Sequence, residues 1–388
     1  MYGKLFSIVG AAALVMGATA ASANDVKLPS RMTWTAYDTT ASGYAMAIAM
    51  GNMMRQHYGT ELRVIPGRND VSRMLPLVQG QADICACGIA SYYGQEATFI
   101  FNKSDWGPIR IRGLFNNIGA NGNVAVVAKN AGIREWKDLK GKRVAWVRGA
   151  PALNIITEGT VRFAGLTMDD VKTVEFAGWG ASVDGVINDQ ADLAVVSTAS
   201  THVQRLAASP RGAFWPLYPH DDAEAWERML EVIPYQGKRM ISVGIALEEN
   251  PTGKVPWEGT GFPYPHVVSL DTLADDTAYG VTKAAMTHWD DYKDSPASEG
   301  WKIENQEMVY IMPYHPGAVR YWQEAGVWTA EAQANQEQLL KRQDLLVQAW
   351  TEFMAGKPSQ DGFEEAWLAV RAERLEAAGM PVPFREHR

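Results

Sequence analysis

Two copies of one sequence pattern decide the fold of this chain. The first copy, LVQGQADICACGIASYY at residues 77–93, reads as a helix end, a tight turn and a short apolar strand. The second copy, VINDQADLAVVSTAS at residues 186–200, has Gln-Ala-Asp at 190–192 in the place of Gln-Ala-Asp at 81–83. The tripeptide by itself could recur simply because it suits a turn from a helix into a strand. The pattern around it indicates a larger repeated unit.

The flanking sequence extends each copy to strand, helix, strand, helix, strand. Strands that alternate with helices predict a mostly parallel sheet whose faces are covered by helices. We therefore expect an α/β protein of two lobes, with the ligand cleft at the carboxyl ends of the strands. The segments that precede the repeated turn are predicted as strands at 31–37, 61–67, 142–147 and 171–178, and as helices at 41–58, 71–80, 150–165 and 182–189.

The chain has 388 residues, which is enough for two or three domains. Residues 1–23 have the pattern of a secretory signal peptide: a lysine, an apolar run too short for a comfortable membrane span, and a small-residue cleavage site. We expect an exported, periplasmic protein that is not membrane-inserted when mature. The predicted boundaries are 24–126 for the first part of lobe one, 127–262 for lobe two, and 263–388 for the rest of lobe one with C-terminal helices.

Composition limits the partners and the chemistry. The formal net charge of -8 argues against nucleic acid as a partner. The two cysteines, Cys85 and Cys87, are predicted to be small buried residues, because a disulfide between them would be strained and no histidines stand nearby to complete a metal site. No cofactor and no metal are expected.

Four segments together carry a resemblance to a known family: residues 67–93, residues 123–159, FAGLTMDDVKTVEF at 163–176, and MPYHPGAVRYWQEAGVW at 312–328. Taken in this order, they resemble the TAXI family of extracytoplasmic solute-binding proteins, which serve tripartite ATP-independent periplasmic (TRAP) transporters. The resemblance covers most of residues 34–328. It implies a type II, periplasmic-binding-protein-like fold that delivers a small solute to the membrane subunits of a permease.

The loop after the first strand departs from the glycine-rich pattern of that family, so the ligand can differ too. It reads AYDTTASGYAMA at 36–47. Helix-capping hydroxyls and exposed N–H groups here would suit a carboxylate, whereas Asp38 would require a cation or an amino group on the solute. The candidate binding residues in this loop are Tyr37, Asp38, Thr39, Thr40, Ser42 and Gly43.

Two further strand ends in lobe one supply candidates. Arg68 could hold a carboxylate through two hydrogen bonds, with Asn69 beside it, or could form a surface salt bridge instead. Gly88, Ser91 and Tyr92 end the repeated strand, and the tyrosine could cover an apolar face of the solute. Arg73, inside the predicted helix, is interpreted as structural.

Lobe two offers equivalent positions. Arg148 is the second candidate for a carboxylate, and Trp179 is either a stacking wall of the cleft or ordinary packing. Ser182, Ser197 and Thr198 complete the predicted set. These residues favour an organic acid or an amino acid as the solute, with room for an aromatic or apolar body.

Two alternatives stay open at this point. Bilobal folds also occur in enzymes, although the sequence has no nucleophile elbow, no P-loop and no His-Glu-x-x-His motif. A soluble sensor that binds a solute and then contacts a signalling partner would use the same fold. A carrier is distinguished from an enzyme because it returns its ligand unchanged.

Overall fold

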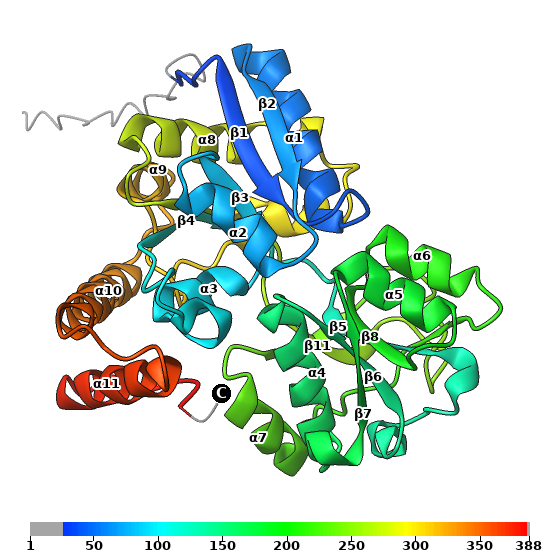
Figure 1. Cartoon of the computed structure of the whole chain (residues 1–388). Helices are drawn as coiled ribbons and strands as arrows, with labels where there is room; N and C mark the ends of the chain where they lie inside the picture. The colour runs from blue at the N-terminus through cyan, green and yellow to red at the C-terminus, as the bar shows by residue number, and fades with distance from the viewer. Residues whose placement is uncertain (1–25, 386–388) are drawn as a thin grey trace, which may run out of the picture.

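The structure, a computed structural model, describes residues 26–385 and consists of two α/β lobes (Figure 1). The predicted signal peptide at 1–23 lies outside the described residues. Lobe one contains the N-terminal third of the chain and most of its C-terminal third, and lobe two lies between them in the sequence. The blue and yellow segments of Figure 1 therefore form one lobe, and the green segments form the other.

The sheet of lobe one has five strands in the order β2-β1-β3-β12-β4. β1 is parallel to β2 and β3, whereas β12 is antiparallel to β3 and β4. The strands are β1 (Arg31–Ala36), β2 (Glu61–Pro66), β3 (Ile84–Cys87), β4 (Ile111–Asn116) and β12 (His266–Leu270).

The sheet of lobe two repeats this arrangement with the order β7-β6-β8-β5-β9. β6 is parallel to β7 and β8, and β5 is antiparallel to β8 and β9, so β5 corresponds to β12. The prediction of a two-lobe, type II periplasmic-binding-protein-like fold is confirmed. The strands are β5 (Asn123–Ala128), β6 (Arg143–Val147), β7 (Lys172–Phe176), β8 (Leu193–Ser197) and β9 (Ala213–Phe214).

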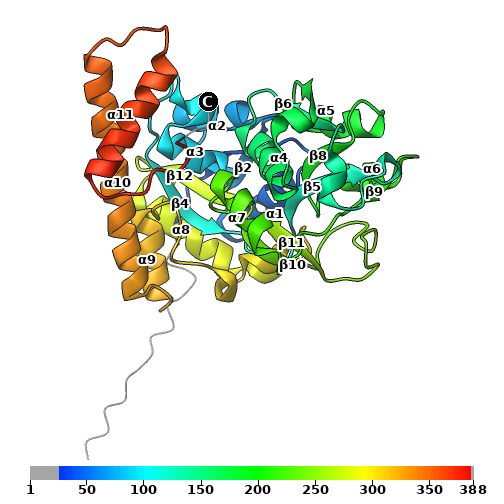
Figure 2. The same cartoon turned by 90° about the horizontal axis from the view of Figure 1, so that it is seen from below.

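Helices cover both sheets (Figure 2), and local sequence determines where they begin and end. α1 (Ser42–Tyr58) ends at Gly59, whose left-handed conformation costs a glycine little. α2 (Asp70–Val78) begins with a capping box in which Asn69 and Ser72 bond each other's backbone N–H. The other helices of the two repeated units are α3 (Ala90–Glu96), α4 (Pro151–Phe163), α5 (Trp179–Ile187) and α6 (Thr201–Ala207).

The repeated Gln-Ala-Asp ties each turn to the first strand of its own lobe. In lobe one, the Asp83 carboxylate accepts a hydrogen bond from the backbone N–H of Thr33 (2.7 Å), and the Asp83 N–H donates to the carbonyl of Thr33 (2.8 Å). In lobe two, Asp192 makes the same two bonds with Arg143, at 3.0 and 2.8 Å. The repeat is therefore a structural clamp, and the cleft lies at the opposite ends of the strands.

The chain crosses between the lobes twice, between β4 and β5 and between β11 (Trp257–Gly261) and β12. β5 pairs with β8 and β9 along its length and belongs to the sheet of lobe two. The crossing therefore precedes this strand, and the predicted boundary at 126/127 falls inside β5. α7 (Ala223–Val232) and β10 (Gly237–Ile241), which pairs with β11, complete lobe two.

The C-terminal helices pack on lobe one. α10 (Ala330–Ala355) and α11 (Phe363–Ala377) follow α8 (Asp275–Thr287) and α9 (Pro316–Glu324). A buried carboxylate on α3, that of Glu96, accepts hydrogen bonds from Arg342 of α10 (2.6 and 2.7 Å) and from Arg371 of α11. Burial by itself would raise the pKa of Glu96, but the two arginines lower it below its usual value. This ion triad fastens both helices to α3.

Cys85 and Cys87 are buried, as predicted, but the expectation that they do not pair is wrong, because they form a disulfide. Residues two apart in a strand point to the same face, so the two side chains do meet. Their Cα atoms are 5.0 Å apart, which lies within the usual range for a disulfide.

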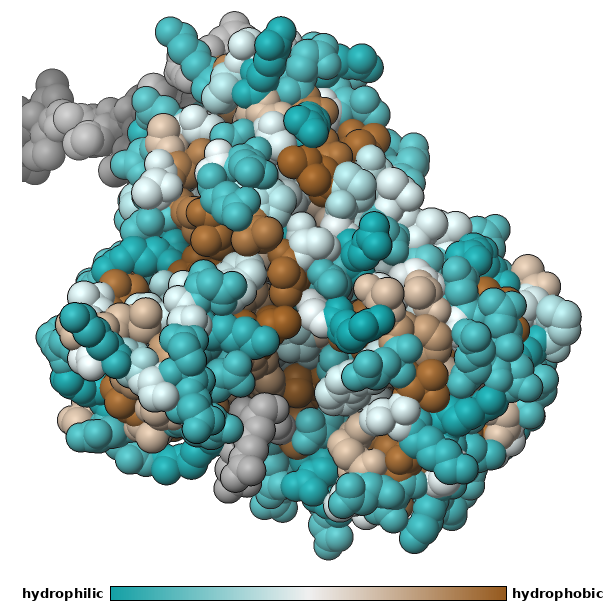
Figure 3. Space-filling model, in the orientation of Figure 1, coloured by the Kyte–Doolittle hydropathy of each residue, from teal (hydrophilic) through white to brown (hydrophobic). Residues whose placement is uncertain are grey.

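The surface of lobe one carries hydrophobic residues over α2 in the view of Figure 3, where Leu75 and Val78 are exposed. Hydrophilic residues cover most of the rest of this face. Within residues 26–385, no helix combines the length and the apolar character that a membrane span requires.

Candidate functional site

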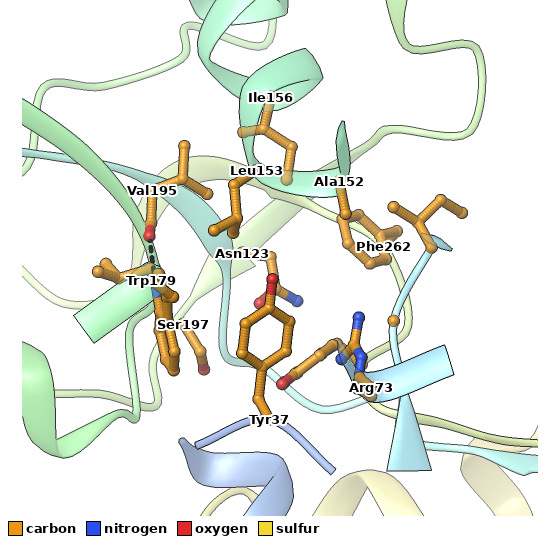
Figure 4. A pocket seen from close by; sticks show the side chains of 14 residues that line it. Tyr37, Arg73, Asn123, Ala152, Leu153, Ile156, Trp179, Val195, Ser197 and Phe262 are labelled. Atoms are coloured by element: carbon orange, nitrogen blue, oxygen red, sulfur yellow. Dashed lines mark hydrogen bonds between the residues drawn. The ribbon is translucent and has the colours of Figure 1, made fainter. Parts of the chain in front are cut away.

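A cavity lies between the two lobes at the carboxyl ends of their strands (Figure 4). The cavity volume is about 30 Å³, far below the several hundred Å³ typical of small-molecule sites, so the lobes must move apart to admit a solute. Lobe one supplies tyrosines and an arginine, and lobe two supplies mostly apolar side chains. The lining residues are Tyr37, Arg73, Gly88, Ile89, Asn123, Ala152, Leu153, Ile156, Trp179, Val195, Val196, Ser197, Phe262 and Tyr264.

The charged part of the site comes from α2. The residues of α2 that are buried, Asp70, Arg73, Met74 and Leu77, have the spacing of one helix face. Arg73 Nη2 donates to Asp70 Oδ1 (2.9 Å), and the side chains of Arg73 and Asp70 are only 1% and 0% exposed. A charged pair thus occupies the N-terminal half of a face whose other members are apolar.

The Arg73 guanidinium has donors to spare. Its carbon atom lies 4.1 Å from the centre of the Tyr37 ring, which stabilises the cation. Among the residues that the structure describes, no acceptor bonds its Nε or Nη1 atoms. The same holds for Nδ2 of Asn123, which lines the cavity from β5. Buried donors of this kind are costly to leave unpaired, so the site favours a ligand that accepts hydrogen bonds.

Asp70 connects the two lobes. Its Oδ1 accepts from the Tyr37 hydroxyl (3.1 Å), and its Oδ2 accepts from the backbone N–H of Ala152 (2.8 Å), in the first turn of α4. Burial raises the pKa of Asp70, although the adjacent Arg73 opposes this shift. A lobe-one carboxylate therefore occupies the positive end of a lobe-two helix, where free N–H groups attract anions.

Lobe two forms an apolar wall opposite Arg73. Leu153 and Ile156 project from α4 toward Tyr37 in Figure 4. The indole of Trp179 is held by a hydrogen bond from Nε1 to the carbonyl of Val195 (2.8 Å), and it meets the Tyr37 ring edge-on at 5.3 Å between centroids. This wall suits the apolar part of a solute. Ser197 adds a hydroxyl group to the same wall.

Four of the predicted binding residues line the cavity: Tyr37, Gly88, Trp179 and Ser197. Gly88 permits a close approach, because a Cβ there would lie 3.2 Å from the Tyr264 ring and 3.4 Å from Nη2 of Arg73. Burial raises the pKa of Tyr264 to about 12, so its phenol is neutral.

The two arginines predicted to bind a carboxylate do not line the cavity. The side chains of Arg68 and Arg148 are exposed, and both residues join the lobes through their backbone. The Arg68 carbonyl accepts from the N–H of Trp179 (2.9 Å), and the Arg148 carbonyl accepts from Nδ2 of Asn69 (3.0 Å). Asn69 is thus a helix cap and an interlobe contact. The two arginines follow strands that end near the cavity, as predicted, but their side chains are exposed to solvent.

The loop at 37–44 contributes a second interlobe contact. Asp38 accepts from the backbone N–H of Thr40 (3.0 Å), and the Thr40 hydroxyl lies 2.6 Å from Nε2 of His202 in lobe two. Burial by itself would raise the pKa of Asp38, but hydrogen bonds from His202 and Thr40 lower it. The Ser42 hydroxyl donates to Ser197 Oγ (3.3 Å). The predicted capping of α1 by a hydroxyl is wrong, because its N-cap, Ala41, makes no side-chain cap bond.

The remaining predicted binding residues do not line the cavity. Gly43 packs under the Tyr264 hydroxyl, which lies 3.1 Å from where its Cβ would be, and Thr39 is exposed. Ser91 and Ser182 donate to backbone carbonyls three residues earlier in the chain. Thr198 donates to the carbonyl of Val243 (2.7 Å). Tyr92 is not among the residues that line the cavity, and its ring meets that of Phe384 edge-on at 5.8 Å.

Arg73, Asn123 and Tyr264 are lining residues with polar groups that were not predicted from the sequence. A signal for Arg73 was present: Asp70 and Arg73 fall on the same helical stripe as Met74 and Leu77, which places two charges on a buried face. The segment that contains Ala152 and Leu153 was predicted to border the cleft, but Arg148 was chosen from it as the binding residue. Asn123 had no such signal, because it reads as the polar start of an apolar strand.

Comparisons with solved structures give the following similarities. The alkanesulfonate-binding protein SsuA from Xanthomonas axonopodis pv. citri is 15% identical, with a TM-score of 0.42 over 86% of this chain and 96% of that one. An ABC transporter periplasmic binding protein from Brucella ovis is 11% identical, with a TM-score of 0.40 over 66% and 67% of the two chains. An ancestral arginine-binding protein is 15% identical, with a TM-score of 0.38 over 71% and 99%.

A search of curated protein sequences gave no match. The sequence model of the NMT1-like family matches residues 109–326, which is more than half of the chain and includes the whole sheet of lobe two. The chain therefore belongs to the NMT1-like family.

Proposed function

We propose that this protein is a periplasmic solute-binding protein that encloses a small organic acid between its lobes and delivers it to a TRAP-type permease. The observation that carries the proposal is the buried Arg73, which lines the interlobe cavity with two donor nitrogens that no described residue accepts from. The solute supplies the missing acceptors through its carboxylate.

The chemistry of the polar lining supports an anionic group. An arginine has five N–H donors in a planar fork, so it can bond Asp70 through Nη2 and still bind a solute through Nε and Nη1. Asn123 Nδ2 adds a neutral donor from lobe two. Hydrogen bonds that involve an ionised partner contribute about 1.5–3 kcal/mol each, so two of them are sufficient to select an acid over its neutral analogue.

The remainder of the lining supports an apolar body on that acid. Leu153, Ile156 and Phe262 surround the cavity, and Trp179 and Tyr37 add aromatic surface. Asp38, which had been considered as a partner for an amino group or a cation, is bonded to Thr40 and His202 and does not line the cavity. An organic acid therefore fits this lining better than an amino acid does.

The interlobe contacts support a mechanism of closure. Asp70 bonds the N–H of Ala152 across the cleft, and the Asn69 side chain bonds the carbonyl of Arg148. These contacts form only when the lobes meet, and a solute held by Arg73 and the wall of α4 adds to them. The solute shifts the population toward the closed state by its stronger contacts there, and the permease recognises that state.

The TRAP partner and the periplasmic location rest on the resemblance to the TAXI family and on the signal-peptide pattern at residues 1–23. A carrier also differs from an enzyme in a measurable way, because it releases the solute unchanged.

A thermal-shift screen of the purified protein tests the proposal. The panel contains aliphatic and aromatic carboxylic acids, with the matched amides and amino acids as controls. Ligand that binds the folded state raises Tm in a dose-dependent way. We expect acids to raise Tm, matched amides not to, and mass spectrometry to recover the acid unchanged. Consumption of the acid would indicate an enzyme, and shifts only with neutral solutes would contradict the role of Arg73.

The permease is tested separately, by uptake of the identified acid into cells that lack this protein. We expect uptake to be restored by the intact chain and to require a TRAP-type permease. Uptake that persists without such a permease would contradict the proposed partner while leaving the binding role intact.

A further inference from the structure

Two histidines and an aspartate that lie far apart in the sequence meet at one end of lobe one. His57 lies in the last turn of α1, His288 follows α8, and Asp291 ends the short helical turn after it. His57 Nε2 is 2.9 Å from Asp291 Oδ2, and His288 Nδ1 is 3.6 Å from the same oxygen. The three atoms all lie within 4.8 Å of one another.

We propose that His57, His288 and Asp291 bind a divalent transition metal ion, with Zn²⁺ as the representative ion. Zinc bonds nitrogen and carboxylate oxygen at about 2.0–2.2 Å in a tetrahedron, which places neighbouring ligand atoms about 3.3–3.5 Å apart. The separations of 2.9 and 3.6 Å bracket this value. Imidazole nitrogen with one carboxylate is a donor set that suits zinc, copper and nickel rather than calcium or magnesium.

The arrangement of the rings is compatible with metal entry. The two imidazoles stack with centroids 3.8 Å apart and planes 20° from parallel, so at least one ring must rotate out of the stack before both nitrogens point at one ion. The side chains of His57 and Asp291 are 28% and 33% exposed and are free to make that adjustment. Three protein ligands leave a fourth position open for water or for another molecule.

A fourth residue orients His288. The Tyr58 hydroxyl lies 2.9 Å from His288 Nε2, the ring nitrogen that does not face Asp291. When neutral His288 carries its proton on Nε2, it donates to Tyr58 and presents the lone pair of Nδ1 to the metal. Ligating histidines usually have such an outer partner.

The metal site is separate from the solute cavity. Ser42, at the start of α1, contacts Ser197 at the cleft, and His57 lies fifteen residues further along the same helix. At 1.5 Å per residue this separation is about 22 Å. Metal binding would therefore join the end of α1 to the segment after α8 and stabilise lobe one without touching the solute.

Isothermal titration calorimetry of the untagged protein with ZnCl₂ tests the site, supported by the visible absorption of bound Co²⁺. We expect one ion per chain, loss of this binding in His57→Ala and in His288→Ala, and binding about tenfold weaker in Tyr58→Phe. His220→Ala is the matched control, because His220 lies in lobe two and bonds the carbonyl of Gly259. This control should bind zinc as the parent protein does.

Two results would overturn the proposal: no saturable zinc binding by the parent protein, or the same binding in His57→Ala. The first would indicate that the cluster is only a histidine–aspartate ion pair. His57 is exposed at a helix end, so this variant should fold even if His288→Ala does not. Tyr58→Phe distinguishes an oriented site from a chance surface contact, because it removes only the outer partner of His288.

Discussion

The two lobes have the same strand order and the same clamp at the repeated turn, yet their cleft walls differ. Lobe one presents a buried ion pair, Asp70 and Arg73, on a helix face. At the corresponding helix of lobe two, α5, the chain places Trp179 in the wall and no charged residue among those that are buried. The repeated unit thus provides the scaffold twice, and only the copy in lobe one places a buried charged pair on this helix.

This difference assigns separate tasks to the lobes. Under the proposed function, lobe one would hold the carboxylate of the solute on its own, because Arg73 is fixed by Asp70 and by the Tyr37 ring before lobe two arrives. Lobe two adds the apolar wall, the Asn123 amide and the N–H of Ala152. Binding is expected to begin on lobe one and to be completed by closure.

The largest expected effect is the loss of affinity when the lobe-one charge is removed. Arg73→Ala deletes two donors to an ionised group, which corresponds to about 3 kcal/mol or more, or at least a hundredfold in Kd. Arg148→Ala, in lobe two, should change Kd by less than about twofold, since exposed charges outside a site contribute little. Titration calorimetry with the acid found in the screen measures both.

Arg73→Ala also leaves Asp70 buried without its partner, which can destabilise the protein. Asn123→Ala is the second variant, because it removes a neutral donor from the same site and leaves the ion pair intact. Loss of affinity in Arg148→Ala with none in either of the other variants would reverse the assignment of tasks to the lobes.

The next effect concerns the two clamps. Asp192 is 8% exposed and pairs with Arg143 (2.6 Å) and with Arg211 (3.1 Å), whereas Asp83 is exposed. Asp192→Ala should therefore lower the free energy of unfolding by about 2 kcal/mol, because it removes a carboxylate that bonds two arginines, while Arg211 keeps its bonds to the carbonyls of Val186 and Ala191. Asp83→Ala should cost about 1 kcal/mol, the value of one hydrogen bond. Urea unfolding at pH 7 measures the difference, and equal losses would show that the clamps are equivalent.

The contribution of Asp192 to the free energy of unfolding should also depend on pH. Burial by itself would raise the pKa of Asp192, but hydrogen bonds from Arg143 and Arg211 lower it from 3.8 to about 2. A pKa that is lower in the folded state contributes stability above pH 4 that is lost as the pH falls from about 4 to about 2. The loss should be about 1–2 kcal/mol after allowance for solvent screening.

This pH effect is measured as the difference between the parent protein and Asp192→Asn in urea unfolding at pH 5 and pH 3. The difference in the free energy of unfolding between the two proteins should be smaller at pH 3 than at pH 5. A difference that is the same at both pH values would show that Asp192 is not held in its charged form by the two arginines.

The smallest expected effect is on the affinity for the solute when an aromatic residue is changed in the cavity rather than outside it. Trp179→Phe keeps an aromatic ring but loses the hydrogen bond to Val195, so the affinity for the acid should fall by about 1 kcal/mol, or five- to tenfold. Tyr92→Phe, on lobe one but directed at Phe384, should leave Kd unchanged. A larger effect at Tyr92 than at Trp179 would contradict the position of the cavity.

Sequence was sufficient to predict the fold because the determining signals are local. Alternation of apolar strands with helical segments, and the duplicated Gln-Ala-Asp turn, predict the parallel strands of both sheets. The C-terminal helices expected after residue 263 are observed for the same reason, the longest being α10 (Ala330–Ala355). The antiparallel direction of β5 and β12 does not follow from that alternation.

The site was less predictable because it depends on where side chains point after the lobes meet. Arg68 and Arg148 follow strands, as predicted, but their side chains turn to solvent and only their carbonyls face the other lobe. Arg73 was set aside because it lies within a helix, although its place on the stripe with Met74 and Leu77 is visible in the sequence. The bond between Asp70 and Ala152 joins residues 82 positions apart, which no local pattern encodes.

The most direct test is a crystal structure of the protein with the acid that the screen identifies. The proposed mechanism predicts that the carboxylate of the solute accepts hydrogen bonds from Nε or Nη1 of Arg73 and from Nδ2 of Asn123, with its apolar body against Leu153 and Trp179. A carboxylate bound instead by Arg68 or Arg148, or one that displaces Arg73 from the cavity, would contradict it.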